Sequence, residues 1–293
     1  MVGSLFPLIQ RLRRALPFDM GGGDSHETRS RCAVRNEQNQ REHNEDSFLI
    51  TELLPTFDGP PLTILAVADG MGGHSHGEEV SSEALKKFGL SLFENLVLEQ
   101  SLNRLNRSFA TDMATLSQTL MSALKQVNHH VLRMVQNNGW TKAGSTIVAA
   151  AILGTEAVAM NLGDSSLFHY RAADQHLLKI TQDHSMAGVL LRAGRITPEM
   201  ARVHEGADQL AFYLGAKELP TVEPVYKFEV GAADLLLLCS DGISGSLSDE
   251  QIAHILKHGD DDLESIADRL VQESLAAGET DNQTLILWQQ RDL

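Results

Sequence analysis

Five aspartates stand where predicted β-strands begin or end, and their placement is the clearest sign of chemistry in this sequence. They are Asp46, Asp69, Asp164, Asp241 and Asp281. Asp69 and Asp241 come at the ends of apolar runs, whereas Asp46 and Asp281 precede such runs. In an antiparallel sheet the end of one strand lies beside the start of the next, so these carboxylates are expected to gather at one edge. One Asp-Gly pair alone is usually an ordinary turn, but five such boundaries together favour a shared site.

Carboxylates held that close repel one another unless their pKa values rise or they bind cations. The aspartates have no accompanying cluster of histidine and cysteine, and oxygen ligands of this kind favour Mg²⁺ or Mn²⁺ over zinc. His74 and His76 form an H-x-H pair that zinc sites also use, but a third ligand does not stand nearby in the sequence. The pattern therefore predicts a site for hard divalent cations.

Short strands and long amphipathic helices are the elements expected to position these aspartates. Strand-like runs occur at Ser47 to Ile50, Leu62 to Ala68, Thr146 to Leu153, Ala157 to Leu162, Leu167 to Tyr170, Val222 to Phe228, Leu235 to Cys239 and Thr284 to Trp288. Helical spacing runs from Val80 to Leu96 and from Leu116 to Val135. Two further helices are indicated near the C-terminus, one opened by Ser248 with Gln251 at the capping-box position and one closed by Gly278. Several strands are apolar throughout, so both of their faces must be covered. The prediction is an α+β fold, a four-layer α/β/β/α sandwich with two central antiparallel sheets flanked by helix pairs.

Charge and cysteine content limit the kind of partner and the kind of chemistry. The chain has 24 basic and 39 acidic side chains and a net charge of −15, which disfavours nucleic acid or an anionic membrane as the main partner. Cys32 and Cys239 lie far apart, so a disulfide framework is not indicated. Neither cysteine is followed by arginine six positions later, so the phosphatase loop that carries a cysteine nucleophile is absent.

The glycine run Gly21-Gly22-Gly23 divides a basic leader from the rest of the chain. We expect residues 1–28 to form a flexible leader, or in part an amphipathic surface segment over Leu5 to Leu16, and residues 29–293 to form one domain. The leader lacks the unbroken apolar region of a secretory signal and the length of a membrane span. We therefore expect a cytoplasmic protein without a membrane span.

Seven motifs in a fixed order resemble the signature of the metal-dependent protein phosphatase family, type 2C (PPM), in its bacterial serine/threonine form. They are Arg41-x-x-Asn44-Glu45-Asp46, Ala68-Asp69-Gly70-Met71-Gly72-Gly73-His74, Gly144-Ser145-Thr146, Asn161-x-Gly163-Asp164-Ser165, Thr181-x-Asp183-His184-Ser185, Ser240-Asp241-Gly242 and Asp281-Asn282. The likeness extends from about Arg41 to Trp288. It implies the same layered fold and two Mg²⁺ or Mn²⁺ ions. It also implies hydrolysis of phosphoserine and phosphothreonine in proteins by direct attack of a metal-bridging hydroxide.

The resemblance also assigns the metal ligands. Those of the two main ions are Asp46, Asp69, Gly70, Asp241 and Asp281. Asp69 would bridge the ions, Gly70 would ligate through its backbone carbonyl, and Glu45 is a candidate beside Asp46. A third, weaker ion would be bound by Asp164 with Asp241, although Asp164 could instead orient metal-bound water.

Arg41 is the residue expected to bind the substrate phosphate, because a planar guanidinium can hold two phosphate oxygens at once. The alternative for Arg41 is a surface ion pair. Relatives with histidine directly after the Asp-Gly pair have a candidate general acid there, but this chain has Met71. His74 and His76 remain candidates for that role, with solvated loop residues as the alternative.

A flap is expected at about residues 186–220, since residues 190–198 resemble the flap of bacterial members of the family. Thr197 would cap a short helix begun by Pro198. Such a segment beside the site would influence the choice of substrate. Three arginines there could contact an acidic phosphopeptide: Arg192, Arg195 and Arg202.

The expected partners are phosphoserine and phosphothreonine proteins, including a serine/threonine kinase or its targets, and the chain is expected to be a monomer. Two other functions stay open. One is a pseudophosphatase that binds phosphoproteins without turnover, which the retained Asp69, Asp241 and Asp281 count against. The other is a regulatory phosphatase that acts on a small phosphoprotein antagonist.

Overall fold

The computed structural model describes residues 29–53, 60–72, 76–103, 112–207, 209–222, 224–257 and 262–291. The leader predicted over residues 1–28 lies outside these residues, as does His74. Within the described part of the chain, helices that are long and apolar enough to cross a membrane are not found.

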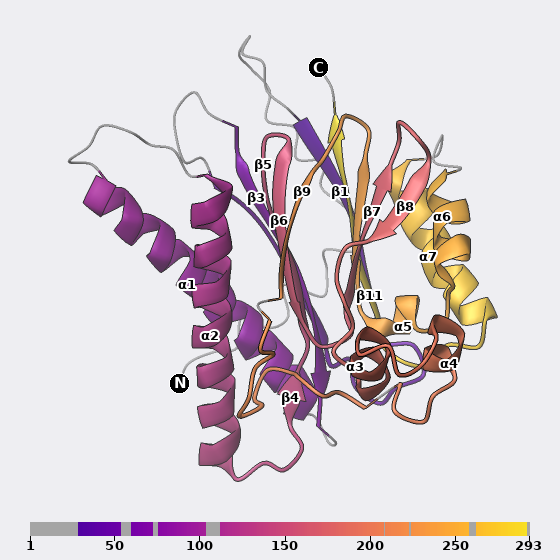
Figure 1. The fold of residues 1–293 in the computed structure, drawn as a ribbon, viewed down its shortest axis with the longest axis horizontal. Helices are drawn as coiled ribbons and strands as arrows, with labels where there is room; N and C mark the ends of the chain where they lie inside the picture. The colour runs from indigo at the N-terminus through magenta and orange to yellow at the C-terminus, as the bar shows by residue number, and fades with distance from the viewer. Residues whose placement is uncertain are drawn as a thin grey trace, which may run out of the picture.

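Two antiparallel sheets lie at the centre of the fold (Figure 1). The first has the strand order β1-β11-β10-β7-β8. Its strands are β1 Arg29–Glu37, β7 Ser166–Arg171, β8 His176–Lys179, β10 Leu235–Cys239 and β11 Gln283–Arg291. Every residue of β10 is buried, as expected for a central strand that is covered on both faces.

The second sheet has the order β2-β3-β5-β6-β9, and β4 pairs with the end of β3. Its strands are β2 Asp46–Leu53, β3 Leu62–Met71, β4 Gly144–Ser145, β5 Ile147–Leu153, β6 Glu156–Leu162 and β9 Val225–Glu229. The two sheets face each other across a core to which Leu65 and Val148 contribute from one sheet and Leu236 and Ile286 from the other.

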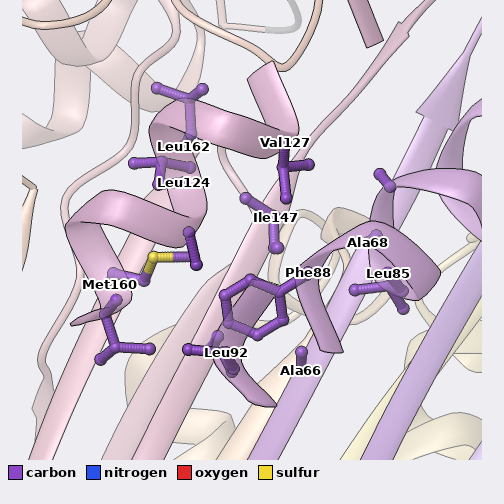
Figure 2. Close-up of a cluster of buried hydrophobic side chains, with 14 of the residues drawn as sticks. Ala66, Ala68, Leu85, Phe88, Leu92, Leu124, Val127, Ile147, Met160 and Leu162 are labelled. Atoms are coloured by element: carbon purple, nitrogen blue, oxygen red, sulfur yellow. The ribbon is translucent and has the colours of Figure 1, made fainter. Parts of the chain in front are cut away.

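Helix pairs cover the outer faces of the two sheets (Figure 1). The helices are α1 His76–Asn103 and α2 Met113–Asn138 over the second sheet, and α6 Asp249–Lys257 and α7 Leu263–Ala276 over the first. Phe88 and Leu92 of α1 lie with Leu124 of α2 in the core against the sheet (Figure 2). The α+β fold with its four layers is thus confirmed.

The predicted helix signals also hold in detail. The Ser248 hydroxyl accepts a hydrogen bond from the Gln251 amide at 3.3 Å, and the Gln251 side chain accepts one from the Ser248 amide at 2.9 Å. In the segment predicted to form a flap, the Thr197 hydroxyl accepts from the Met200 amide and caps α4, Pro198–Arg202. The same segment contains α3, Met186–Arg192, which the sequence did not indicate.

Some elements differ from those predicted. The strand expected over Val222 to Phe228 is β9, which begins at Val225, since the proline before it has no amide hydrogen to pair. Strands β1 and β8 were not predicted, because β1 is a polar edge strand and β8 has only four residues. Asp241, which was expected at the end of the apolar run, comes just after β10 and begins the short helix α5, Asp241–Ser244.

Candidate metal centre

The strand ends bring the predicted aspartates to one edge of the two sheets. In the β2–β3 pair Asp46 lies directly opposite Asp69. Asp241 follows β10 closely, and Asp281 precedes β11, the strand that pairs with β10. Burial raises the pKa of Asp69 well above its usual value, and four neighbouring carboxylates raise it further: Asp46, Asp241, Asp164 and Asp281. All five predicted aspartates therefore lie close enough to influence one another.

Asp46 has the least solvent exposure of the five, with 6% of its surface accessible. Its Oδ2 accepts a hydrogen bond from the Ser240 hydroxyl at 2.8 Å. Its Oδ1 is buried and has no hydrogen-bond partner among the described residues. Burial raises the pKa of Asp46 to about 7. The hydrogen bonds that Asp46 accepts lower its pKa, whereas the charges of Asp241 and Asp281 raise it. A buried carboxylate oxygen without a donor is costly, and a cation is one partner that would satisfy it.

Asp164 lies in the loop between β6 and β7. Burial raises its pKa well above the usual value, and the charges of Asp241 and Asp183 raise it further. The backbone beside it is held in place, because the Gly163 amide donates to Nδ1 of His184 at 3.3 Å. Asp164 is thus beside Asp241, as a shared ligand pair would require.

The arrangement is a set of adjacent carboxylates rather than a complete coordination shell. Among the described residues, no group of three or more His, Cys, Asp or Glu side chains is arranged to hold a metal ion. Two observations nevertheless fit hard cations. One is the buried Oδ1 of Asp46, which has no hydrogen-bond partner among the described residues. The other is the raised pKa of Asp46, Asp69 and Asp164, which is caused mainly by burial and increased by neighbouring carboxylates. A bound cation would stabilise the ionised form of such groups.

Only glycine fits directly after Asp69 and Asp241, because another chain segment packs against the backbone at both positions. A Cβ atom on Gly70 would lie 2.1 Å from the carbonyl oxygen of Gly77. A Cβ atom on Gly242 would lie 1.9 Å from the carbonyl oxygen of Asn282. Both distances are far below any tolerated contact, so each Asp-Gly pair lets a second chain segment pack directly behind the aspartate.

Arg41 reaches the same edge and forms an ion pair there. Its Nη2 lies 2.5 Å from Oδ2 of Asp281, and 56% of the Arg41 side chain is exposed. Both sequence-based expectations for Arg41 are therefore compatible with its place: it lies at the predicted metal edge, and it is paired with one of the predicted ligands.

Glu45 points to the start of α1. Its carboxylate accepts a hydrogen bond from the Gly77 amide, and burial raises its pKa. A carboxylate at this position caps the first turn and is favoured by the helix dipole. The structure thus gives Glu45 a local capping role beside the candidate ligand role suggested by the sequence.

Three polar residues support the aspartates, and the sequence analysis gave them no individual role. Thr146 exchanges two hydrogen bonds with the backbone of Asp69, at 2.8 and 3.0 Å. Ser240 donates to Asp46. Asn282 accepts from the Glu45 amide at 2.9 Å, and its side-chain amide donates to two carbonyls of the segment that carries Arg41. Each of them stands within the seven motifs, which was the available signal.

The remaining candidates are His76 and the arginines of the segment predicted to form a flap. His76 is the first residue of α1, and its ring stacks on Trp140 with 4.4 Å between the centroids. In the flap, Arg192 donates to the backbone carbonyl of Asp183 and Arg195 is exposed. The side chain of Arg202 lies outside the described part of the chain.

Comparisons with known proteins indicate the class of protein to which this chain belongs. The family model described as Protein phosphatase 2C matches residues 35–278. The serine/threonine phosphatase Stp of Listeria monocytogenes is 32% identical over 255 residues, which is 86% of this chain and 92% of that protein. The crystal structure of the Mycobacterium tuberculosis serine/threonine phosphatase PstP/Ppp superposes with a TM-score of 0.70 at 29% identity, covering 89% of this chain and 99% of that one. A structure of the PstP catalytic domain in complex with two manganese ions has a TM-score of 0.66 and 28% identity, and covers 90% of this chain and 99% of that one.

The layered fold, the aspartate edge and these likenesses define an enzyme class. This chain belongs to the protein phosphatase 2C family and is a protein phosphatase. The resemblance drawn from the seven motifs is thereby confirmed.

Proposed function

We propose that this phosphatase hydrolyses phosphoserine and phosphothreonine in proteins and depends on two divalent ions, Mg²⁺ or Mn²⁺. Their ligands would be Asp46, Asp69, Gly70, Asp241 and Asp281, with Asp69 shared by both ions. The observation that carries the proposal is the pairing of Asp46 with Asp69 across β2 and β3, together with a buried Oδ1 on Asp46 that has no donor among the described residues. The serine/threonine phosphatases among its relatives and the manganese ions in PstP support it.

When bound, such ions would offset the negative charge of the phosphate and make water a better nucleophile. The residues of this chain would position and balance them. Thr146 and Ser240 hold Asp69 and Asp46 in place through the hydrogen bonds described above. Asp164 with Asp241 would hold a third, weaker ion.

Arg41 would bind the substrate phosphate. Its guanidinium is half exposed and forms an ion pair with the carboxylate of Asp281. A phosphate that binds the guanidinium through two oxygens could take the place of this carboxylate. Releasing Asp281 in this way would also free that carboxylate for a metal ion. Substrate binding and metal binding would then favour each other.

The substrates would be phosphoproteins, including a serine/threonine kinase or its targets. The flap beside the site would contribute to their selection. We also propose that the chain acts as a monomer.

The test is release of phosphate from a phosphothreonine peptide with Mn²⁺ and with EDTA. Native protein should be active with Mn²⁺, inactive with EDTA and insensitive to thiol alkylation. Asp69→Asn should reduce kcat by about a hundredfold or more, since a metal ligand supports several kcal/mol of transition-state stabilisation. Asp174→Asn is the matched control, because Asp174 is a surface residue paired with Arg171. Full activity in EDTA, or an unimpaired Asp69→Asn variant, would refute the proposal.

A further inference from the structure

A groove of about 550 Å³ lies on the surface of the helix pair α1 and α2. We call it the α1–α2 groove. Its lining consists of Lys87 from α1 and seven residues of α2: Gln126, His129, His130, Arg133, Met134, Asn137 and Asn138. The α2 residues recur at intervals of three and four, so they form one face of that helix.

The charge of the groove is opposite to that of the protein. The whole chain has a net charge of −15. Among the described residues that line the groove, the fully charged side chains, Lys87 and Arg133, are both basic. Helix α2 has 26 residues and does not contain a single Asp or Glu. Helix α2 therefore adds no negative charge to the groove, and Lys87 and Arg133 can attract negatively charged groups there.

The groove also offers hydrogen-bonding groups of a kind that suits a peptide. His129 and His130 can donate from their rings, and the side-chain amides of Gln126 and Asn137 can pair with a peptide backbone. His129, Arg133 and Asn137 are exposed, and Met134 supplies a partly buried apolar surface between them. Polar donors along one helix face beside an apolar side chain fit an extended segment rather than a small ion.

The C-terminal end of α2, which lines the groove, leads along the chain to the aspartate edge. Helix α2 ends at Asn138, and Trp140 then stacks on His76 at the start of α1. The chain continues into β4, where Ser145 pairs with Gly70. In Figure 1 this end of α2 lies at the same end of the molecule as β4 and the flap helices. A segment bound in the groove would therefore hold its parent protein near the metal centre.

We propose that the α1–α2 groove docks an acidic peptide segment of a partner protein, at a site separate from the metal centre. Exposed ion pairs of this kind are weak and are screened by salt. Docking should therefore be strongest at low ionic strength and should serve mainly to attract and orient the partner.

A fluorescein-labelled oligoglutamate peptide is the probe, and its binding to the full chain is followed by fluorescence anisotropy in EDTA. The double variant Lys87→Glu/Arg133→Glu should weaken binding by about tenfold or more, since two attractive charges become repulsive. The matched control is Lys227→Glu/Lys257→Glu, which makes the same change in net charge at exposed positions on β9 and α6. The control should change the affinity by less than about threefold. Turnover of p-nitrophenyl phosphate with Mn²⁺ should be unchanged in both variants, which shows that they fold.

A second measurement does not rely on a variant. Adding the peptide to isotopically labelled native protein should shift the amide resonances of residues 126–138 of α2 and leave those of α6 and α7 in place. Three results would overturn the proposal: absence of binding at low ionic strength, equal losses in the two double variants, or binding that appears only with Mn²⁺. The last would place the acidic peptide at the metal centre instead.

Discussion

Replacing Asp46 with asparagine should stabilise the metal-free protein while it destroys the metal site. Unfolded Asp46 loses its proton near 3.8, and in the folded protein burial raises its pKa to about 7. Between these values the folded state binds more protons than the unfolded state, so the free energy of unfolding falls as the pH rises from about 4 to about 7. Above pH 7 the ionised carboxylate therefore destabilises the metal-free fold.

The magnitude follows from the size of that rise. A shift of one pKa unit corresponds to 1.36 kcal/mol. A rise of about three units in the pKa of Asp46 therefore destabilises the fold by at most about 4 kcal/mol. The charges of Asp241 and Asp281 share part of the effect, and we expect a gain of about 2–4 kcal/mol for Asp46→Asn at pH 8. The asparagine oxygen can still accept the hydrogen bond from Ser240. For a domain of this size the gain would raise Tm by about 4–16 °C.

The assay is thermal unfolding in EDTA at pH 8 and at pH 4, with Asp234→Asn as the matched control. Asp234 is also buried, but its carboxylate accepts hydrogen bonds from the His169 ring at 2.7 Å and from the amides of Ala172 and Gly231, each at 2.8 Å. Neutralising it should cost about 2 kcal/mol or more, because those donors lose a charged partner. A lower Tm for Asp46→Asn at pH 8, or an equal gain at pH 4, would refute the reasoning.

Three other outcomes are expected. Gly242→Ala should lower the free energy of unfolding by about 2 kcal/mol or more in chemical denaturation and should impair turnover, because its Cβ would meet the carbonyl oxygen of Asn282 at 1.9 Å. The affinity for Mn²⁺ in calorimetry should fall by up to about tenfold for each pH unit below 7, because the proton on Asp46 competes with the ion. Arg41→Ala should raise KM for a phosphothreonine peptide by about 10- to 100-fold in steady-state kinetics, since a charged hydrogen-bonding group for the phosphate is lost, and Arg41→Lys should restore only part of it.

Each of these has a control or a contrary result. For the glycine, Gly89→Ala in α1 is the comparison: its nearest neighbour atom would lie at 3.5 Å, and alanine favours the helix by up to about 1 kcal/mol. An affinity for Mn²⁺ that stays constant between pH 6 and pH 8 would contradict the role of Asp46. An unchanged KM for Arg41→Ala would leave the arginine as a surface ion pair.

The long, strongly periodic elements were predictable from the sequence because burial dictates their pattern. Phe88 and its neighbours at intervals of four lie in the helix–sheet core, and the apolar run from Leu235 to Cys239 is a strand buried on both faces. Strand β1 was not predictable in this way. It is an edge strand with polar residues, and its pairing with β11 depends on backbone hydrogen bonds that hydrophobicity does not reveal.

At the site, the meeting of Asp46 and Asp69 followed from antiparallel pairing alone. The side-chain contacts did not follow. The ion pair of Arg41 with Asp281 joins positions 240 residues apart. The cap at α1 comes from Glu45, which stands in another part of the chain, just before β2. Such contacts are set by tertiary packing, so the sequence indicates which residues gather but not which of them pair.

The most direct test of the central claim is anomalous diffraction at the manganese edge from crystals soaked in Mn²⁺. The account predicts two strong peaks that share Asp69, one of them also contacting Asp46 and the other Asp241 and Asp281. Peaks that lie elsewhere, or the absence of a peak at the aspartate edge at a saturating concentration of Mn²⁺, would contradict it.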